Sequence, residues 1–237
     1  MKVLVIGGMH GNEPLGIKLI EFLQKADYKN IDGVYANKLA IEGNCRFMTS
    51  DLNRSFPGDI QSCDYEPKRA AELLELCSRY DLVLDFHNTH FSGNDCSFVG
   101  QNSNQGLFDV SAYLRLRRVV VADYECINKY APNCISVEIS LDSERNDIEY
   151  WRRLIVRLSK LETVKSSTTI EKFKFVYRMT LDDKVELGLE KRNFTAFEAI
   201  DDSLAKKLGV ASPAYPIFVA DDYTPYNFGG LLNKIDV

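Results

Sequence analysis

The apolar positions of the chain fall into short continuous runs and longer stretches with helical spacing, and the two kinds of segment alternate. The run Val3-Leu4-Val5-Ile6 predicts a buried strand, and residues 81–86 predict a second one. Apolar side chains three or four positions apart predict amphipathic helices over 15–22 and 67–80. We therefore expect an α/β fold class with a mostly parallel, mixed central sheet flanked by helices. The alternation continues with strands expected at 32–37, 97–101, 118–122 and 134–139 and helices at 107–116 and 147–161.

A change to small and polar residues at 164–169 (Val-Lys-Ser-Ser-Thr-Thr) indicates a domain boundary. Beyond it, aromatic and β-branched residues predict strands at 172–177, 194–199 and 215–220. We expect a main domain over residues 1–163 and a small β-rich C-terminal module over residues 164–237.

Composition and charge narrow the class of protein. The 237 residues are 45% hydrophobic and 27% charged, values ordinary for a soluble globular protein, and the net charge is −5. Without a basic surplus or a Lys/Arg cluster, neither nucleic acid nor a membrane surface is expected as a partner. The six cysteines form no Cys-x-x-Cys pair, so we expect reduced thiols and a cytoplasmic location.

The glycine-rich turn at residues 7–14, between the first strand and the first helix, holds two candidate metal ligands. His10 and Glu13 lie at the carboxyl end of the expected strand, where open α/β sheets bind ligands. His87 follows the strand at 81–86, and two imidazoles with one carboxylate are a ligand set of catalytic zinc. His90 is the competing third ligand. Asp85 is either an acceptor for an imidazole N–H or a plain polar strand terminus.

A zinc hydrolase also requires a base and a cation. Zinc with three protein ligands leaves a coordination position for water and lowers the pKa of that water. Glu138 offers the base because it interrupts an apolar strand, unless that strand lies at an edge and Glu138 faces solvent. Arg46, Asn53 and Arg54 belong to a long polar loop at 44–58, and they offer a cation and a carboxylate clamp unless they are merely solvated.

Four motifs carry a resemblance to a known family over roughly residues 1–160: His10-Gly11-Asn12-Glu13, Asp51-Leu52-Asn53-Arg54, Asp85-Phe86-His87-Asn88-Thr89 and Val137-Glu138. In this order they resemble the succinylglutamate desuccinylase/aspartoacylase family of zinc amidohydrolases with a zinc-carboxypeptidase fold, and Asn88-Thr89 is more similar to the aspartoacylase branch.

The resemblance implies a role for each matched residue. His10, Glu13 and His87 would bind one Zn²⁺ per chain, and Glu138 would be the general base. Arg46 would polarise the scissile carbonyl. The substrate would be bound by Asn53, Arg54, Tyr124 and a C-terminal tyrosine, for which Tyr223 is preferred and Tyr226 is the alternative.

Two departures from the family pattern bear on the substrate. Asn128, followed by Lys129, replaces a second carboxylate-binding arginine, and Ile139-Ser140 replaces the Gly-Pro of aspartoacylases. Losing a charged hydrogen bond to a carboxylate costs about 1.5–3 kcal/mol, enough to change the preferred amino acid.

We expect a zinc-dependent amidohydrolase that releases a carboxylate and a free amino acid from a small N-acyl amino acid. The C-terminal module would narrow the active-site entrance. The alternatives are a zinc carboxypeptidase acting on peptides and a non-catalytic metal-binding protein. The oligomeric state, a homodimer included, stays open.

Overall fold

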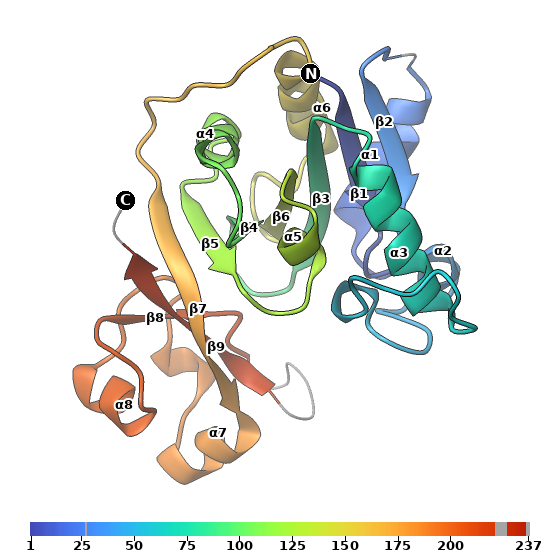
Figure 1. Cartoon of the computed structure of the whole chain (residues 1–237). Coiled ribbons are helices and arrows are strands. Elements are labelled where there is room, and N and C mark those ends of the chain that lie inside the picture. Colours follow the sequence, from blue (N-terminus) through green and yellow to red (C-terminus); the bar gives the residue numbers. More distant parts are fainter. Residues whose placement is uncertain (27, 221–226, 236–237) are drawn as a thin grey trace.

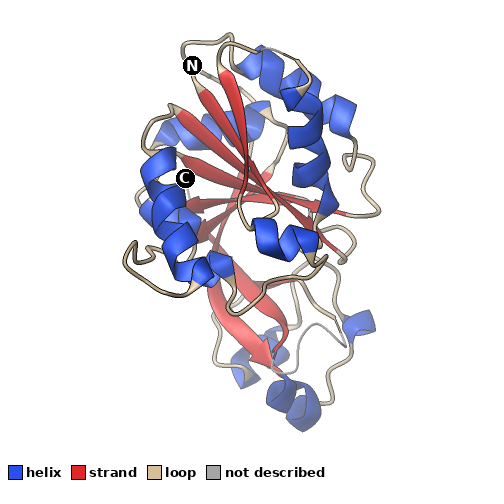
Figure 2. Ribbon diagram, turned by 90° about the vertical axis from the view of Figure 1, so that its right-hand side faces the viewer, coloured by secondary structure: helices blue, strands red, loops and turns tan. Residues whose placement is uncertain are grey.

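One mixed β-sheet organises the molecule (Figures 1 and 2). The structure is a computed structural model, and it describes residues 1–26, 28–220 and 227–235. The nine strands within these ranges follow the order β2-β1-β3-β6-β4-β5-β7-β9-β8. Neighbouring strands are parallel except in the pairs β4–β6, β7–β9 and β8–β9. Their bounds are β1 (Val3–Gly7), β2 (Ile31–Tyr35), β3 (Leu82–Thr89), β4 (Cys96–Gly100), β5 (Arg118–Ala122), β6 (Cys134–Ser140), β7 (Glu171–Thr180), β8 (Ala214–Ile217) and β9 (Asn227–Ile235).

Helices cover both faces of the sheet (Figure 2). Val3 and Val5 face the core under α1, α4 and α6, which is centred on the fully buried Trp151. Leu4 and Ile6 point to the opposite face, under α3 and α5, because successive strand side chains alternate. The helices are α1 (Pro14–Gln24), α2 (Lys38–Glu42), α3 (Tyr65–Cys77), α4 (Gln105–Tyr113), α5 (Ile127–Tyr130), α6 (Ile148–Leu158), α7 (Leu181–Leu187) and α8 (Asp202–Lys207), with 3-10 turns η1 (Leu52–Arg54) and η2 (Lys191–Asn193).

The expected α/β class and mostly parallel, mixed sheet are confirmed. The expected strand at 194–199 is wrong, because these residues form turns. Phe197 has a left-handed backbone (φ 61°), and its ring packs beside Phe173 with ring centroids 5.3 Å apart. The side chain of Phe197 is therefore buried in the core although its backbone lies in a turn. Strand β9 was not expected, because its central Gly229-Gly230 pair weakens the strand signal.

The C-terminal residues continue the same sheet. Strand β7 pairs in parallel with β5, through Arg118 and Glu171, and in antiparallel fashion with β9. The helices α7 and α8 lie beside these strands at the lower end of the molecule in Figure 1. An extended segment without helix or strand, residues 161–170, leads into β7. The domain boundary at 163/164 stays a prediction.

All six cysteines are free of disulfide bonds. Within the described ranges, no helix has both the length and the apolar character needed to cross a bilayer.

Candidate active site

The turn after β1 requires glycine at two positions. Gly8 has a φ of +70°, a left-handed conformation that side chains with a Cβ adopt at a cost. At Gly11, a Cβ atom would lie 2.0 Å from the backbone carbon of Ala40, so the turn can pack against α2 only without a side chain there. These two residues hold His10 and Glu13 in fixed positions at the end of the strand.

Strand register brings the other polar residues to the same face. In the parallel pair β3–β6, Asp85 lies opposite Ser136, and His87 lies opposite Glu138. Because side chains alternate along a strand, these four point to one face while Phe86 and Val137 enter the core on the other. Strand β3 runs to Thr89, so His87 lies within the strand rather than after it. Strand β6 is central, so Glu138 is not on an edge strand.

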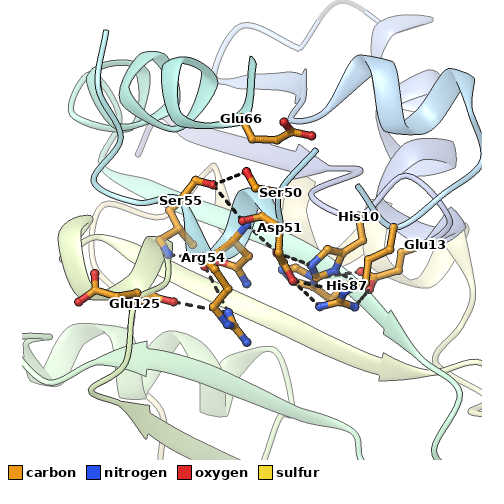
Figure 3. A network of polar contacts seen from close by, with 12 residues as sticks. His10, Glu13, Ser50, Asp51, Arg54, Ser55, Glu66, His87 and Glu125 are labelled. Carbon is orange, nitrogen blue, oxygen red and sulfur yellow. Dashed lines mark hydrogen bonds and ion pairs between the residues drawn. The ribbon is translucent and has the colours of Figure 1, made fainter. Parts of the chain in front are cut away.

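The three candidate metal ligands converge (Figure 3). The ligand atoms of His10, Glu13 and His87 all lie within 4.8 Å of one another. Nδ1 of His10 is 2.7 Å from Glu13 Oε1, and Nδ1 of His87 is 2.9 Å from Glu13 Oε2. His90, the competing candidate, is exposed and is not a member of this cluster.

A second layer of carboxylates holds the outer nitrogen of each imidazole. His87 Nε2 lies 2.8 Å from Asp85 Oδ2, which agrees with the acceptor reading of Asp85. His10 Nε2 lies 3.1 Å from Asp51 Oδ1. With its outer N–H donated to a carboxylate, each ring can offer the Nδ1 lone pair to a metal ion. Without a metal, a protonated Nδ1 donates to Glu13. The sequence analysis missed the role of Asp51, although the residue stands in the Asp-Leu-Asn-Arg motif.

Asp51 connects the cluster formed by His10, Glu13 and His87 to the long loop at residues 44–58. Its Oδ2 accepts hydrogen bonds from Arg46 Nε (3.3 Å) and Nη2 (2.9 Å). Its Oδ1 also accepts from the backbone N–H of Asn53, which caps η1. Farther out, the buried Glu66 accepts from the N–H groups of Met48 and Thr49. Figure 3 shows Asp51 between the His10 cluster and the pair Ser50–Ser55.

The electrostatics of this cluster suit a divalent cation. Burial acts to lower the pKa of His10 and His87, but the neighbouring carboxylates outweigh burial and raise both pKa values. Burial acts to raise the pKa of Glu13, yet the two imidazoles lower it below its ordinary range. Asp85 Oδ1 is buried without a hydrogen-bond partner among the described residues. So many buried carboxylates favour positive charge between the imidazoles, as a hydrogen-bonded proton or as a metal ion.

A cavity of about 320 Å³ opens beside the cluster. Glu138 and Arg46 line it, and burial raises the pKa of Glu138 to about 7 while His87 opposes the shift. A carboxyl group with such a pKa can exchange a proton near neutral pH. Arg46 Nη1 lies 3.8 Å from Glu13 Oε1, close enough to the cluster to reach a bound carbonyl oxygen.

Three of the predicted substrate-binding residues lie close to one another in the cavity wall. Arg54 donates to the backbone oxygens of Asn53 (3.2 Å) and Glu125 (3.5 Å), and its guanidinium lies 4.9 Å from the ring centroid of Tyr124. All three predicted residues, Asn53, Arg54 and Tyr124, line the cavity. Tyr223 and the alternative Tyr226 lie outside the described residues.

Asn128 lies in the cavity wall, but its amide is engaged by the protein. Its Nδ2 donates to the backbone oxygens of Phe98 and Cys134, and its Oδ1 accepts from Ser136. Lys129 forms an ion pair with Glu125 and does not line the cavity. Among the described residues, the cavity wall therefore contains two arginines, Arg46 and Arg54, and no lysine.

Aromatic rings fill the rest of the wall. The ring of Phe218 lies 6.0 Å from that of Phe98 in a stacked arrangement and 6.1 Å from that of Phe91. Tyr124 adds a fourth ring to the lining. A ligand in this cavity would therefore meet aromatic surface as well as the polar groups.

Comparison with known proteins identifies the family of the chain. Residues 1–142 match the family model described as "Succinylglutamate desuccinylase/Aspartoacylase catalytic domain". An N-acyl-aromatic-L-amino acid amidohydrolase (carboxylate-forming) of Rattus norvegicus is 32% identical over 136 residues, which are 49% of this chain and 42% of that protein. An aspartoacylase of Danio rerio is 28% identical over 143 residues, 53% of this chain and 44% of that protein. The matched segment thus spans less than half of either relative.

Solved structures agree on the fold across the chain. The succinylglutamate desuccinylase from Chromobacterium violaceum has a TM-score of 0.75 at 16% identity, covering 100% of this chain and 85% of that one. Murine aminoacylase 3 has a TM-score of 0.70 at 20% identity, covering 99% and 95%. At these identities the likeness establishes the fold alone, and the family model carries the assignment. The chain belongs to the succinylglutamate desuccinylase/aspartoacylase family.

Proposed function

We propose that this chain is a zinc-dependent amidohydrolase that cleaves a small N-acyl amino acid into a carboxylate and a free amino acid. The observation that carries the proposal is the convergence of His10, Glu13 and His87 beside a cavity that also holds Glu138. The ligand set is that of catalytic zinc sites with an open coordination position. The relatives' printed names, N-acyl-aromatic-L-amino acid amidohydrolase and aspartoacylase, support the same reaction class.

Glu138 and Arg46 each have a role beside the metal in this reaction. Zinc, when bound, supplies Lewis acidity that lowers the pKa of water and polarises a carbonyl group. Glu138 takes the proton of the attacking water and returns it to the leaving amine, a transfer suited to its raised pKa. Arg46 donates to the oxygen on which negative charge develops.

The α-carboxylate of the substrate binds at the other end of the cavity. Arg54 presents a planar guanidinium that can make two parallel hydrogen bonds, and Asn53 lies beside it. Tyr124 keeps the guanidinium in place by stacking. Phe218, from the C-terminal residues, forms part of the cavity wall, which supports a C-terminal module that narrows the entrance to small substrates.

The side chain of the preferred amino acid is apolar or aromatic rather than acidic. Phe91, Phe98 and Phe218 form the wall available to it, and the amide of Asn128 is already bonded to the protein. A second carboxylate would be desolvated there without a cationic partner, which costs binding free energy.

The test is hydrolysis of a substrate panel by zinc-loaded protein, measured as release of free amine. N-acetyl-L-tyrosine and N-acetyl-L-phenylalanine should be cleaved with kcat/KM values at least about tenfold above those of N-acetyl-L-aspartate and N-succinyl-L-glutamate. The variant Glu138→Gln serves as the control for a contaminating hydrolase. A panel left intact by the zinc-loaded protein would contradict the proposed activity.

Two alternatives remain distinguishable by the same preparation. A carboxypeptidase would release C-terminal residues from peptides and leave the N-acyl amino acids intact. A non-catalytic metal protein would bind zinc and cleave neither, and the position of Glu138 in the cavity wall, rather than toward bulk solvent, argues against it.

A further inference from the structure

A second cleft, of about 480 Å³, has four arginines in its wall. Arg115, Arg117 and Arg118 come from the turn between α4 and β5 and from the first residue of β5. Arg145 comes from the loop between β6 and α6. None of the residues lining this cleft also lines the cavity at the metal cluster. The cleft is therefore separate from the candidate active site.

Most of these guanidinium groups are unoccupied by the protein itself. Within the described ranges, the side chains of Arg115, Arg117 and Arg145 have no hydrogen bond or ion pair. Arg118 is held in place, since it donates to the backbone oxygen of Gly93 (2.9 Å) and lies 4.5 Å from the ring centroid of Phe197. One fixed cation and three unpaired ones face the same space.

The two carboxylates in the cleft already accept hydrogen bonds. Asp95 accepts from the backbone N–H of Ser140 (2.9 Å) and from the hydroxyl of Ser143 (2.5 Å). Asp142 accepts from Ser92. Four arginines against two carboxylates leave a local positive charge, although the whole chain carries −5. This local excess needs an explanation other than general surface composition.

The backbone at Arg115 adds to this. It follows helix α4 in a left-handed conformation (φ 61°), the position at which helices commonly carry glycine. A residue with a Cβ is disfavoured there by about 1–2 kcal/mol. An arginine at a strained position, with an unpaired side chain beside other arginines, supports a role for its charge.

We propose that this cleft binds a small ligand with more than one phosphate group. Guanidinium forks match phosphate oxygens in pairs, and they prefer this geometry to single point contacts. The volume lies within the range of small-molecule sites, so it admits a ligand larger than a single phosphate. This proposal does not rest on the proposed hydrolysis, because the cleft shares no lining residue with the cavity at His10, Glu13 and His87.

The test is calorimetric titration of zinc-loaded protein with pyrophosphate, with zinc content measured before and after. Saturable binding at one site per chain is expected, and it should weaken as salt is added. The double variant Arg115→Ala/Arg117→Ala should lose at least about tenfold in affinity. The matched control Arg157→Ala/Arg192→Ala removes the same charge from exposed positions outside the cleft and should change affinity less than about twofold.

Three outcomes would overturn the proposed site, and a fourth would overturn the proposed ligand class. They are the absence of saturable binding, an equal loss in both double variants, and binding that survives the cleft variant but disappears in Arg54→Ala. The last would assign the anion to the metal cavity. If the first double variant fails to fold, Arg145→Ala removes a guanidinium from a different loop and tests the same cleft. A single phosphate ion that binds as tightly as pyrophosphate would also contradict the proposed ligand class.

Discussion

Replacement of Asp85 by asparagine tests the layer of carboxylates behind the metal ligands. Asp85 is fully buried, and its Oδ2 lies 2.8 Å from His87 Nε2. Asparagine keeps the shape and an accepting oxygen but removes the charge that raises the pKa of His87. Loss of such an outer partner lowers metal affinity by about 10–100-fold. At about 1.4 kcal/mol per tenfold, the expected loss is about 1.4–2.8 kcal/mol of zinc-binding free energy.

The assay is competition for zinc with a chromophoric chelator of known affinity. Ser136→Ala is the matched control, because it removes the hydroxyl that lies 3.2 Å from Asp85 Oδ2 and 2.9 Å from Asn128 Oδ1 without changing the partner of His87. We expect the control to change zinc affinity less than about threefold. In zinc-free protein, the pKa of His87 measured by NMR should fall in Asp85→Asn. An Asp85→Asn variant that is folded and binds zinc as tightly as the unmodified chain would refute the reasoning.

Three further predictions address the base, the metal and the turn. Glu138→Gln should lower kcat by about 10²–10⁴-fold while zinc content stays at one per chain. In the unmodified enzyme, the acid limb of the kcat/KM profile should lie at or below pH 7, because Glu138 acts deprotonated and a bound cation lowers its pKa further. A loss below tenfold, or an acid limb well above pH 7, would contradict this role. Zinc should raise the melting temperature measured by differential scanning fluorimetry. This increase should be smaller at pH 6 than at pH 8, because the raised pKa values of His10 and His87 let protons compete with the metal. An increase that does not depend on pH would argue against these ligands. Gly11→Ala should lower the free energy of unfolding, measured in urea, by more than about 1 kcal/mol, because the added Cβ would lie 2.0 Å from the Ala40 backbone. The control Gly106→Ala lies in helix α4, and its added Cβ would lie 3.0 Å from the nearest side-chain atom. It should leave the free energy of unfolding unchanged or raise it.

The sequence predicts the sheet and the metal cluster well because both depend on strong local signals. Buried runs such as 3–6 and 81–86 can form little else than central strands. Once these strands are parallel neighbours, the polar residues at their carboxyl ends must meet. The proximity of His10, Glu13 and His87 could therefore be predicted from the sequence.

The parts that were missed depend on long-range contacts. Strand β9 is recognisable only beside β7 and β8, since its glycines suppress the local signal. Phe194 and Phe197 predicted a strand, but their side chains pack into two hydrophobic clusters from backbone that forms no strand. The role of Asp51 depends on the loop folding back over the strand ends, which no periodicity in the sequence reports.

Charge in the metal cluster links these observations to a single physical requirement. Glu13 and Glu138 line one cavity, Asp51 and Asp85 lie against the outer nitrogens of its two imidazoles, and Arg46 pairs with Asp51. Uncompensated, such a set would be costly to bury. Two protonated imidazoles and one divalent ion between neutral imidazoles supply the same positive charge, so proton and metal can exchange without altering the electrostatic balance of the fold. If the site binds zinc as proposed, the ambient pH and zinc concentration would determine which of the two states is populated.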